Sequence, residues 1–125
     1  MNSQLEILGL YKEWSDGGNK SRLDYPGGGQ KVNLLKEKLK NIDDEDIILF
    51  TDAYDVIYNS DLNDVVKKFK SLGSELVFGA EIHCWPDETL KDSYPFGTTD
   101  RRFLNSGVFI GYAKKLKEIT SLPIK

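Results

Sequence analysis

The stretch DIILFTDAYDVIYNSDLNDVVKKFKSLGSELVFGAE, residues 46–81, decides the fold class of this 125-residue chain. It opens with DIILFTD (46–52), a short apolar run rich in β-branched and aromatic residues, which predicts a strand buried on both faces. An amphipathic helix pattern (59–73) follows, and ELVFGAE (75–81) predicts a second buried strand. Strand, helix and strand in such close succession are typical of the βαβ unit of a parallel sheet, so we expect an α/β fold.

The segments around this unit extend the same pattern. The central helix should have Ser60 or Asp61 as its N-cap, and Gly73 should lie just past its end. Outside the unit, the sequence predicts in turn a long glycine-rich loop, an amphipathic helix, an irregular segment, a third strand and a short helix: 15–29, 30–42, 83–102, 106–113 and 114–122. A structureless loop as long as the first of these is often a binding loop or a lid.

Composition sets the class of protein. With 39% hydrophobic, 11% aromatic and 30% charged residues, the chain should fold as one globular domain. Its formal net charge of -3 predicts no attraction to nucleic acid. We find neither a stretch long enough to span a membrane nor a signal peptide at the start of this sequence. The adjacent His83 and Cys84 lack the ligand count of a metal site, so structural packing explains them better.

Two aspartates stand where the first predicted strand ends. Ligands of α/β sheets bind outside the carboxyl ends of the parallel strands, which is where Asp52 and Asp55 should lie. A turn at Ala53 and Tyr54 would bring both carboxylates to one point. Paired carboxylates suit Mg²⁺ or Mn²⁺ completed by water and phosphate, and Tyr54 could stack on an attached base. The motif is therefore interpreted as a metal and nucleotide site.

A simpler interpretation also fits the two aspartates. Asp52 would end a strand, Asp55 would form a turn, and both carboxylates would be solvated. Lys31 and Asn105 leave the same choice open. Lys31 opens a helix behind three glycines and could reach a diphosphate, or it is a solvated helix-start lysine. Asn105, with Ser106, precedes the third strand and could bind sugar hydroxyls, or it belongs to a turn.

Five segments carry a family resemblance by occurring together in one order. They are LGLYKEW (8–14), PGGGQKV (26–32), LFTDAYDVI (49–57), FGAEIHCWPD (78–87) and YPFGTTDRRFLNSGVFIGYA (94–113). Together they resemble the N-terminal glycosyltransferase domain of the procollagen lysyl hydroxylases, the procollagen-lysine 2-oxoglutarate 5-dioxygenases. The resemblance covers nearly the whole chain, from about Leu8 to about Tyr112.

The resemblance implies a GT-A fold, which is a Rossmann-like nucleotide-sugar-binding fold with a mostly parallel sheet flanked by helices. It implies Mn²⁺ bound by Asp52 and Asp55, and a UDP-sugar donor whose uridine lies beside Tyr54. Trp14 and Lys31 match residues that line the donor site in the family, although Trp14 also fits a core or loop anchor. With Asn105 added, these residues form the predicted donor site.

The family also implies a reaction and a compartment. Its multifunctional members transfer galactose or glucose, from UDP-galactose or UDP-glucose, to hydroxylysine or galactosyl-hydroxylysine of collagen in the lumen of the endoplasmic reticulum. Residues 1–125 would be the donor-binding part of a single GT-A domain, incomplete on its C-terminal side. The family's later Asp-rich segment, Asp-Gln pair and His-Gly-Asn motif, whose histidine completes the metal site, do not occur within these residues. Catalysis by this chain alone is therefore left open.

Two other functions remain compatible with the sequence. A non-catalytic nucleotide-sugar or collagen-binding module would retain UDP without releasing it from a sugar donor. An inert scaffold with solvated aspartates would show no metal-dependent nucleotide affinity. A measurement of sugar release from UDP distinguishes the binding module from an enzyme. A measurement of UDP binding distinguishes the inert scaffold from both.

Overall fold

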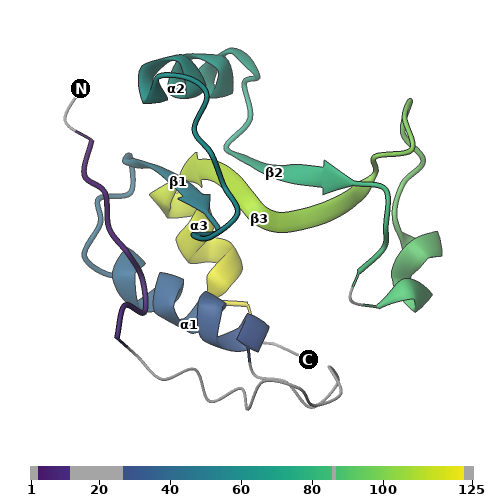
Figure 1. Ribbon diagram of the computed structural model, residues 1–125, viewed down its shortest axis with the longest axis horizontal. Coiled ribbons are helices and arrows are strands. Elements are labelled where there is room, and N and C mark those ends of the chain that lie inside the picture. The colour runs from purple at the N-terminus through teal and green to yellow at the C-terminus, as the bar shows by residue number, and fades with distance from the viewer. Residues whose placement is uncertain (1–2, 12–26, 86, 123–125) are drawn as a thin grey trace. The chain divides into compact units, whose positions relative to one another are not determined.

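The computed structural model describes residues 3–11, 27–85 and 87–122, which belong to two compact units. One unit comprises residues 1–46 with 113–125, and the other comprises residues 47–112. Within the described ranges, no helix combines the length and the apolar character needed to cross a membrane. The elements, labelled in Figure 1, are α1 (Gly27–Leu39), β1 (Ile47–Thr51), α2 (Leu62–Ser71), β2 (Leu76–Glu81), η2 (Glu88–Ser93, a 3₁₀ helix), β3 (Phe103–Tyr112) and α3 (Ala113–Thr120).

The second unit is built on a three-stranded antiparallel sheet with the order β1-β3-β2. The α/β class is confirmed, but the expected parallel pairing of the two strands around α2 is wrong. Since both are antiparallel to β3, β1 and β2 run in the same direction, as a βαβ unit requires. The helix connection leaves room for one strand between them, and Figure 1 shows β3 occupying that place. An apolar run predicts that a segment is a buried strand, but it does not predict which strand will pair with it.

Three phenylalanines lie side by side across the sheet. Phe109 pairs in register with Phe50 on β1 and with Phe78 on β2. Its ring stacks on Phe50, with centroids 4.7 Å apart, and tilts against Phe78 at 5.1 Å. Cross-strand aromatic pairs of this kind each contribute about 0.2–1 kcal/mol to a sheet. They also fix the register of β1 just before its carboxyl end.

Helix α2 begins and ends as the sequence predicts. The Asp61 side chain accepts a hydrogen bond from the Asn63 N–H at 2.7 Å and so caps the helix, and Gly73 follows it with φ 64°. The buried Phe69 of this helix packs its ring against Tyr112 of β3, with ring centroids 5.6 Å apart. The local capping signals were sufficient here because each partner lies within one turn of the residue it caps.

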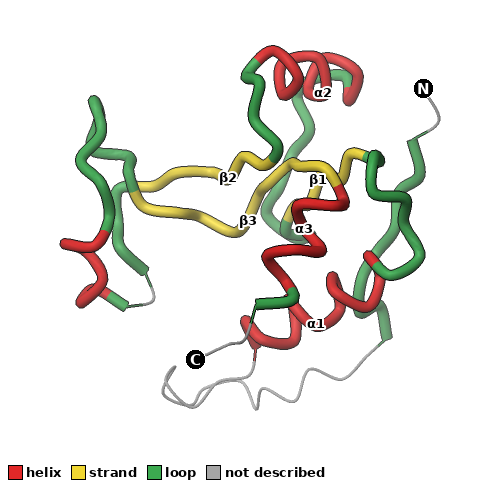
Figure 2. The backbone as a smooth tube through the Cα atoms, turned by 180° about the vertical axis from the view of Figure 1, so that it is seen from behind, coloured by secondary structure: helices red, strands yellow, loops and turns green. Residues whose placement is uncertain are grey.

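The central strand β3 carries a bulge. Phe78 and Gly79 are neighbours on β2, yet they pair with Phe109 and Asn105, so three β3 residues, Ser106–Val108, are extra on that side. On the other side, Val108 still pairs with Thr51 of β1. Beyond the bulge, β2 and β3 continue without β1 as a two-stranded ribbon toward η2, as Figure 2 shows. Strand β3 starts earlier than predicted, so Asn105 lies within the strand and not in a turn before it.

An arginine holds the segment beyond this ribbon. The Nη1 atom of Arg102 donates to two carbonyl oxygens, that of Lys91 at 3.2 Å and that of Tyr94 at 2.9 Å. The same guanidinium lies over the Phe96 and Phe103 rings, 4.6 and 4.5 Å from their centroids. Hydrogen bonds and cation–π contacts from one side chain therefore tie η2 and the residues after it to the start of β3.

The first unit contains α1 and α3. Leu39 and Leu116 are almost fully buried, and the N–H groups of Ala113 and Lys114 donate to the carbonyls of Asp46 and Asp44. Helix α1 begins at Gly27, so Gly27–Gly29 are helical although the sequence placed them in a loop. The rest of that predicted loop, 15–26, lies outside the described residues.

An ion pair in this unit should make the stability of the fold depend on pH in acid solution. Lys117 donates to the Asp44 carboxylate at 2.7 Å, and this hydrogen bond, with the charge of the ammonium, lowers the pKa of Asp44 below its ordinary value. Because the folded-state pKa is the lower one, the pair stabilises the fold above the unfolded-state pKa of Asp44. That contribution is lost as the pH falls through the folded-state pKa.

In a Lys117→Met variant, the pKa of Asp44 is expected to rise toward its ordinary value. An NMR titration of the Asp44 carboxyl carbon measures the change. Lys115→Met is the matched control, because the Lys115 ammonium pairs with Glu118 at 2.8 Å instead. An Asp44 midpoint that is equal in the Lys117 variant and the wild type would contradict the assignment of this shift to Lys117.

Candidate donor site at the end of β1

Asp52 is held at the carboxyl end of β1 by the neighbouring strand. Its N–H donates to the Gly107 carbonyl at 2.8 Å, which continues the β1–β3 ladder by one residue beyond Thr51. The chain then bends through Ala53–Asp55, as convergence of the two carboxylates would require. A hydrogen bond of 2.8 Å between Thr51 Oγ1 and the Tyr58 hydroxyl closes this loop back onto the strand. The loop that carries the aspartates is thus anchored at both ends.

Asp52 and Asn105 come together over Gly107. A Cβ atom placed on Gly107 would lie 3.0 Å from Asp52 Oδ2 and 2.9 Å from Asn105 Oδ1. The two oxygens therefore flank Gly107, one from the residue just after β1 and the other from the residue just before the bulge of β3. Bulges are frequent beside active sites because they redirect a side chain in this way. Any residue other than glycine at this position would bring a Cβ atom too close to the two oxygens.

The Asn105 amide is bound at both of its polar atoms. Its Oδ1 accepts from the Gly107 N–H at 2.8 Å, and its Nδ2 donates to Glu81 Oε1 at 3.2 Å. The sequence analysis did not include Glu81 among the site residues. A signal was available, since Glu81 is the one charged residue in the apolar strand LVFGAE. Its role becomes visible only when the register of β2 against β3 is known.

The other predicted site residues are not brought together by the described contacts. Tyr54 is fully exposed and Asp55 is exposed, so their meeting with Asp52 at one ligand stays a prediction. Lys31 lies on α1, in the other unit, and its side chain is partly buried. Trp14 lies outside the described residues. Site assignments for these four rest on the sequence.

The described residues fit a hard divalent cation better than a soft one. In the ranges 3–11, 27–85 and 87–122, no three His, Cys, Asp or Glu side chains form a group able to hold a metal. At Asp52 and Asn105 the donors are oxygens, which suits Mn²⁺ or Mg²⁺ held by few protein ligands and completed by phosphate and water. Cys84 is buried and donates to the Asp87 carbonyl, in agreement with a packing role.

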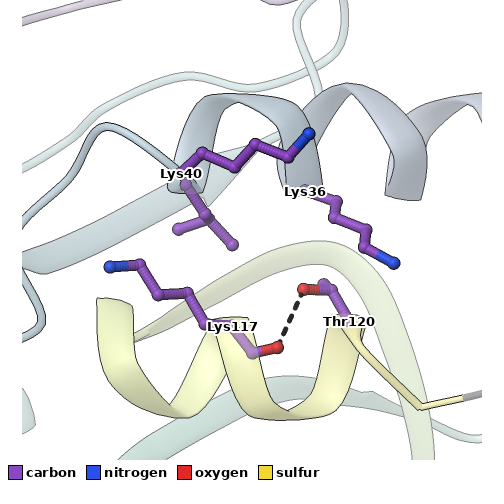
Figure 3. Close-up of a pocket in the computed structure, with 5 residues that line it drawn as sticks. Lys36, Lys40, Lys117 and Thr120 are labelled. Carbon is purple, nitrogen blue, oxygen red and sulfur yellow. Dashed lines mark hydrogen bonds between the residues drawn. The ribbon is translucent and has the colours of Figure 1, made fainter.

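A separate cavity of about 280 Å³ lies between α1 and α3 in the first unit. It is lined by Leu39, Thr120 and three lysines, Lys36, Lys40 and Lys117. Figure 3 shows the three ammonium groups pointing in different directions. The Thr120 hydroxyl donates to the carbonyls of Leu116, at 2.8 Å, and Lys117, at 3.4 Å. The aliphatic stems thus line the cavity, and no convergent set of charges marks it as an anion site.

Comparison with known proteins gives a consistent result. A family model described as the PLOD GT domain matches residues 1–123. Procollagen-lysine,2-oxoglutarate 5-dioxygenase of Drosophila melanogaster is 44% identical over 98% of the chain, which covers 17% of that protein. Multifunctional procollagen lysine hydroxylase and glycosyltransferase of Caenorhabditis elegans is 43% identical over 94% of the chain, and its human counterpart LH3 is 47% identical over 94%. The chain spans 16% of the length of each of the latter two.

Proposed function

Because this chain belongs to the PLOD GT domain family, we propose that residues 1–125 are the donor-binding part of one GT-A glycosyltransferase domain. The fold would be Rossmann-like, with β1 and β2 running in the same direction and the nucleotide-sugar at their carboxyl ends. The observation that carries the proposal is the meeting of the Asp52 and Asn105 oxygens over Gly107 at the end of β1. It supports a polar ligand near these two oxygens.

Asp52 and Asp55 are the residues that would hold Mn²⁺. When bound, the ion would act as a Lewis acid that neutralises the charge on a departing diphosphate. The fit is chemical: the carboxylate of Asp52 is half-buried at the strand end, and Asp55 follows after a bend. The family's further motifs would supply the remaining ligands in a longer protein.

The side chains around the carboxylates would bind the rest of the donor. Tyr54 offers a fully exposed aromatic face on which the uracil base could stack. Trp14 would add a second wall, Lys31 would place an ammonium near the diphosphate, and Asn105 would bind a sugar hydroxyl or help to orient the Asp52 carboxylate. Together they would hold the UDP-sugar in one orientation.

The reaction proposed for the intact domain is transfer of galactose or glucose from the UDP-sugar to hydroxylysine or galactosyl-hydroxylysine of collagen. The acceptor hydroxyl oxygen forms a bond to the anomeric carbon, the bond from that carbon to UDP breaks, and the hydroxyl proton is released. Positioning of the donor by these residues would supply much of the rate. The names of the relatives fit a collagen-like acceptor. We propose that the longer protein acts in the lumen of the endoplasmic reticulum, as the family resemblance implies.

A binding module without turnover is the second proposal. The reason to keep it is that the Asp-Gln pair and the His-Gly-Asn motif, which the family resemblance implies for the complete site, do not occur within residues 1–125. Such a module would retain UDP through Mn²⁺ at the same Asp52 and Asp55 carboxylates. The two proposals share the donor site and differ only in whether the sugar is released from UDP.

The test is a titration of UDP with and without Mn²⁺, followed by the fluorescence of Trp14 and Trp85. The expected result is binding that requires Mn²⁺ in the wild type and that is lost in the Asp52→Ala, Asp55→Ala double variant. The Asp92→Ala, Asp100→Ala double variant is the matched control, because it removes two exposed aspartates elsewhere in the same unit. A folded wild-type chain with no Mn²⁺-dependent affinity would refute the donor site, and release of UDP from UDP-galactose or UDP-glucose would decide for the enzyme.

A further inference from the structure

Glu81 is the last residue of β2, and its carboxylate reaches across to β3. It is partly buried, and its Oε1 accepts the Asn105 Nδ2 hydrogen bond at 3.2 Å. We propose that Glu81 is a positioning residue of the donor site, fixing the Asn105 amide so that its oxygen faces the same point as the Asp52 carboxylate. This inference rests on the proposed function for its consequence, but its structural part is independent of any ligand.

The two hydrogen bonds of Asn105 allow only one orientation of its amide. The Gly107 N–H is a donor and needs the amide oxygen, while the Glu81 carboxylate is an acceptor and needs the amide nitrogen. Turning the amide by half a rotation would set donor against donor at Gly107 and acceptor against acceptor at Glu81. Both contacts are part-buried, so the unmade hydrogen bonds would not be replaced fully by water.

The orientation matters because of the neighbouring carboxylate. With Oδ1 turned toward Gly107, this glycine is flanked by two oxygen acceptors, one from Asn105 and one from Asp52. An acceptor pair suits a cation or the hydroxyl groups of a sugar. If the amide turned, its NH₂ group, which is a donor, would replace Oδ1 beside Gly107, and the pair of acceptors would be lost.

Glu81 therefore acts through Asn105 and not by touching the ligand. The Gly107 N–H holds only the oxygen side of the amide and makes no contact with its nitrogen. The carboxylate supplies the second contact, from a different strand. Because β2 and β3 pair directly next to the bulge, the positions of Glu81 and Asn105 are set by the same ladder that creates the bulge.

The test follows the Asn105 side-chain amide by ¹⁵N NMR in the full chain. In the wild type, the two Nδ2 protons are expected to give separate resonances with slow exchange into water. Glu81→Ala should move them toward the values of a free amide and speed their exchange. Glu81→Gln keeps an acceptor oxygen at the same length and should retain the wild-type signature. Glu88→Ala, at an exposed position of η2, is the control.

The same variants have a binding readout. The dissociation constant of UDP-galactose or UDP-glucose with Mn²⁺ is expected to rise about tenfold in Glu81→Ala and to stay near the wild-type value in Glu81→Gln. In an Asn105→Ala background, Glu81→Ala should add no further loss, because a positioning residue has nothing left to position. If Glu81→Ala does not fold, Glu81→Asp replaces it, since the shorter side chain withdraws the acceptor and keeps the charge.

Failure of the inference and failure of the proposed function are distinguishable. Wild-type protein that binds no UDP-sugar would refute the function, while the Asn105 resonances would still show whether Glu81 orients the amide. Resonances that are equal in wild type, Glu81→Ala and Glu81→Asp would overturn the inference, as would a Glu81→Gln variant that loses the signature. A further loss of affinity from Glu81→Ala in the Asn105→Ala background would also overturn it, because Glu81 would then act by another route.

Discussion

Replacing Gly111 by alanine is expected to lower the free energy of unfolding by about 1–3 kcal/mol. Gly111 is buried in the central strand, where it pairs with Ile48 of β1 and Leu76 of β2. A Cβ atom at this position would lie 2.7 Å from Leu76 Cδ1 and 2.9 Å from the Glu75 carbonyl oxygen. The Leu76 methyl can turn away, but the carbonyl belongs to the backbone, so the strands themselves must separate.

Urea denaturation followed by circular dichroism measures this effect. Gly97→Ala is the matched control, because a Cβ at Gly97 would meet its nearest neighbour only at an ordinary contact distance of 3.8 Å. The control should change the stability by no more than about 0.5 kcal/mol. If the urea midpoints of both alanine variants equal that of the wild type, the close packing of β2 against Gly111 is contradicted.

Replacing Gly107 by alanine is expected to weaken Mn²⁺-dependent UDP-sugar binding by about 10- to 100-fold. The new methyl group would take the point that Asp52 Oδ2 and Asn105 Oδ1 now face, at 3.0 and 2.9 Å. Both distances are shorter than a methyl carbon tolerates, so at least one side chain must move away from the site. The carboxylate and the amide would no longer present their oxygens to one ligand.

Titration calorimetry with the donor and Mn²⁺ measures the loss, and the urea midpoint of each variant shows whether it is folded. Gly97→Ala again serves as the control, since it adds the same methyl group in the same unit without touching either oxygen. A Gly107→Ala variant with wild-type donor affinity would show that the ligand does not bind at this point. Loss of affinity without loss of fold is the expected outcome.

Much of the local structure could be predicted from the sequence because its causes are local. The Asp61 cap, the glycine after α2 and the apolar runs of β1 and β2 depend on neighbours along the chain, and the structure confirms them. The pairing of the strands depends on β3, which is distant in sequence, and there the expected parallel pairing was wrong. Strand β3 also contains two glycines and a bulge, which obscured where it begins.

The candidate site divides in the same way. Asp52 could be found from the sequence because it follows an apolar strand directly, and the structure places it beside Asn105. Glu81 could not, because its role depends on the register between β2 and β3. The need for glycine at position 107 could not be predicted either, because it depends on which side chains lie close to this residue in the fold. The roles of Asp55, Tyr54, Lys31 and Trp14 remain predictions.

The place of β3 in the sheet also has a consequence during protein synthesis. The strand that joins the other two is the last to leave the ribosome, so β1 and β2 emerge with no backbone partner. Until residues 103–112 are available, the apolar runs IILFT and LVFGA remain open to solvent and to other nascent chains. We therefore expect the two strands to be exposed to chaperones and to aggregation during this interval.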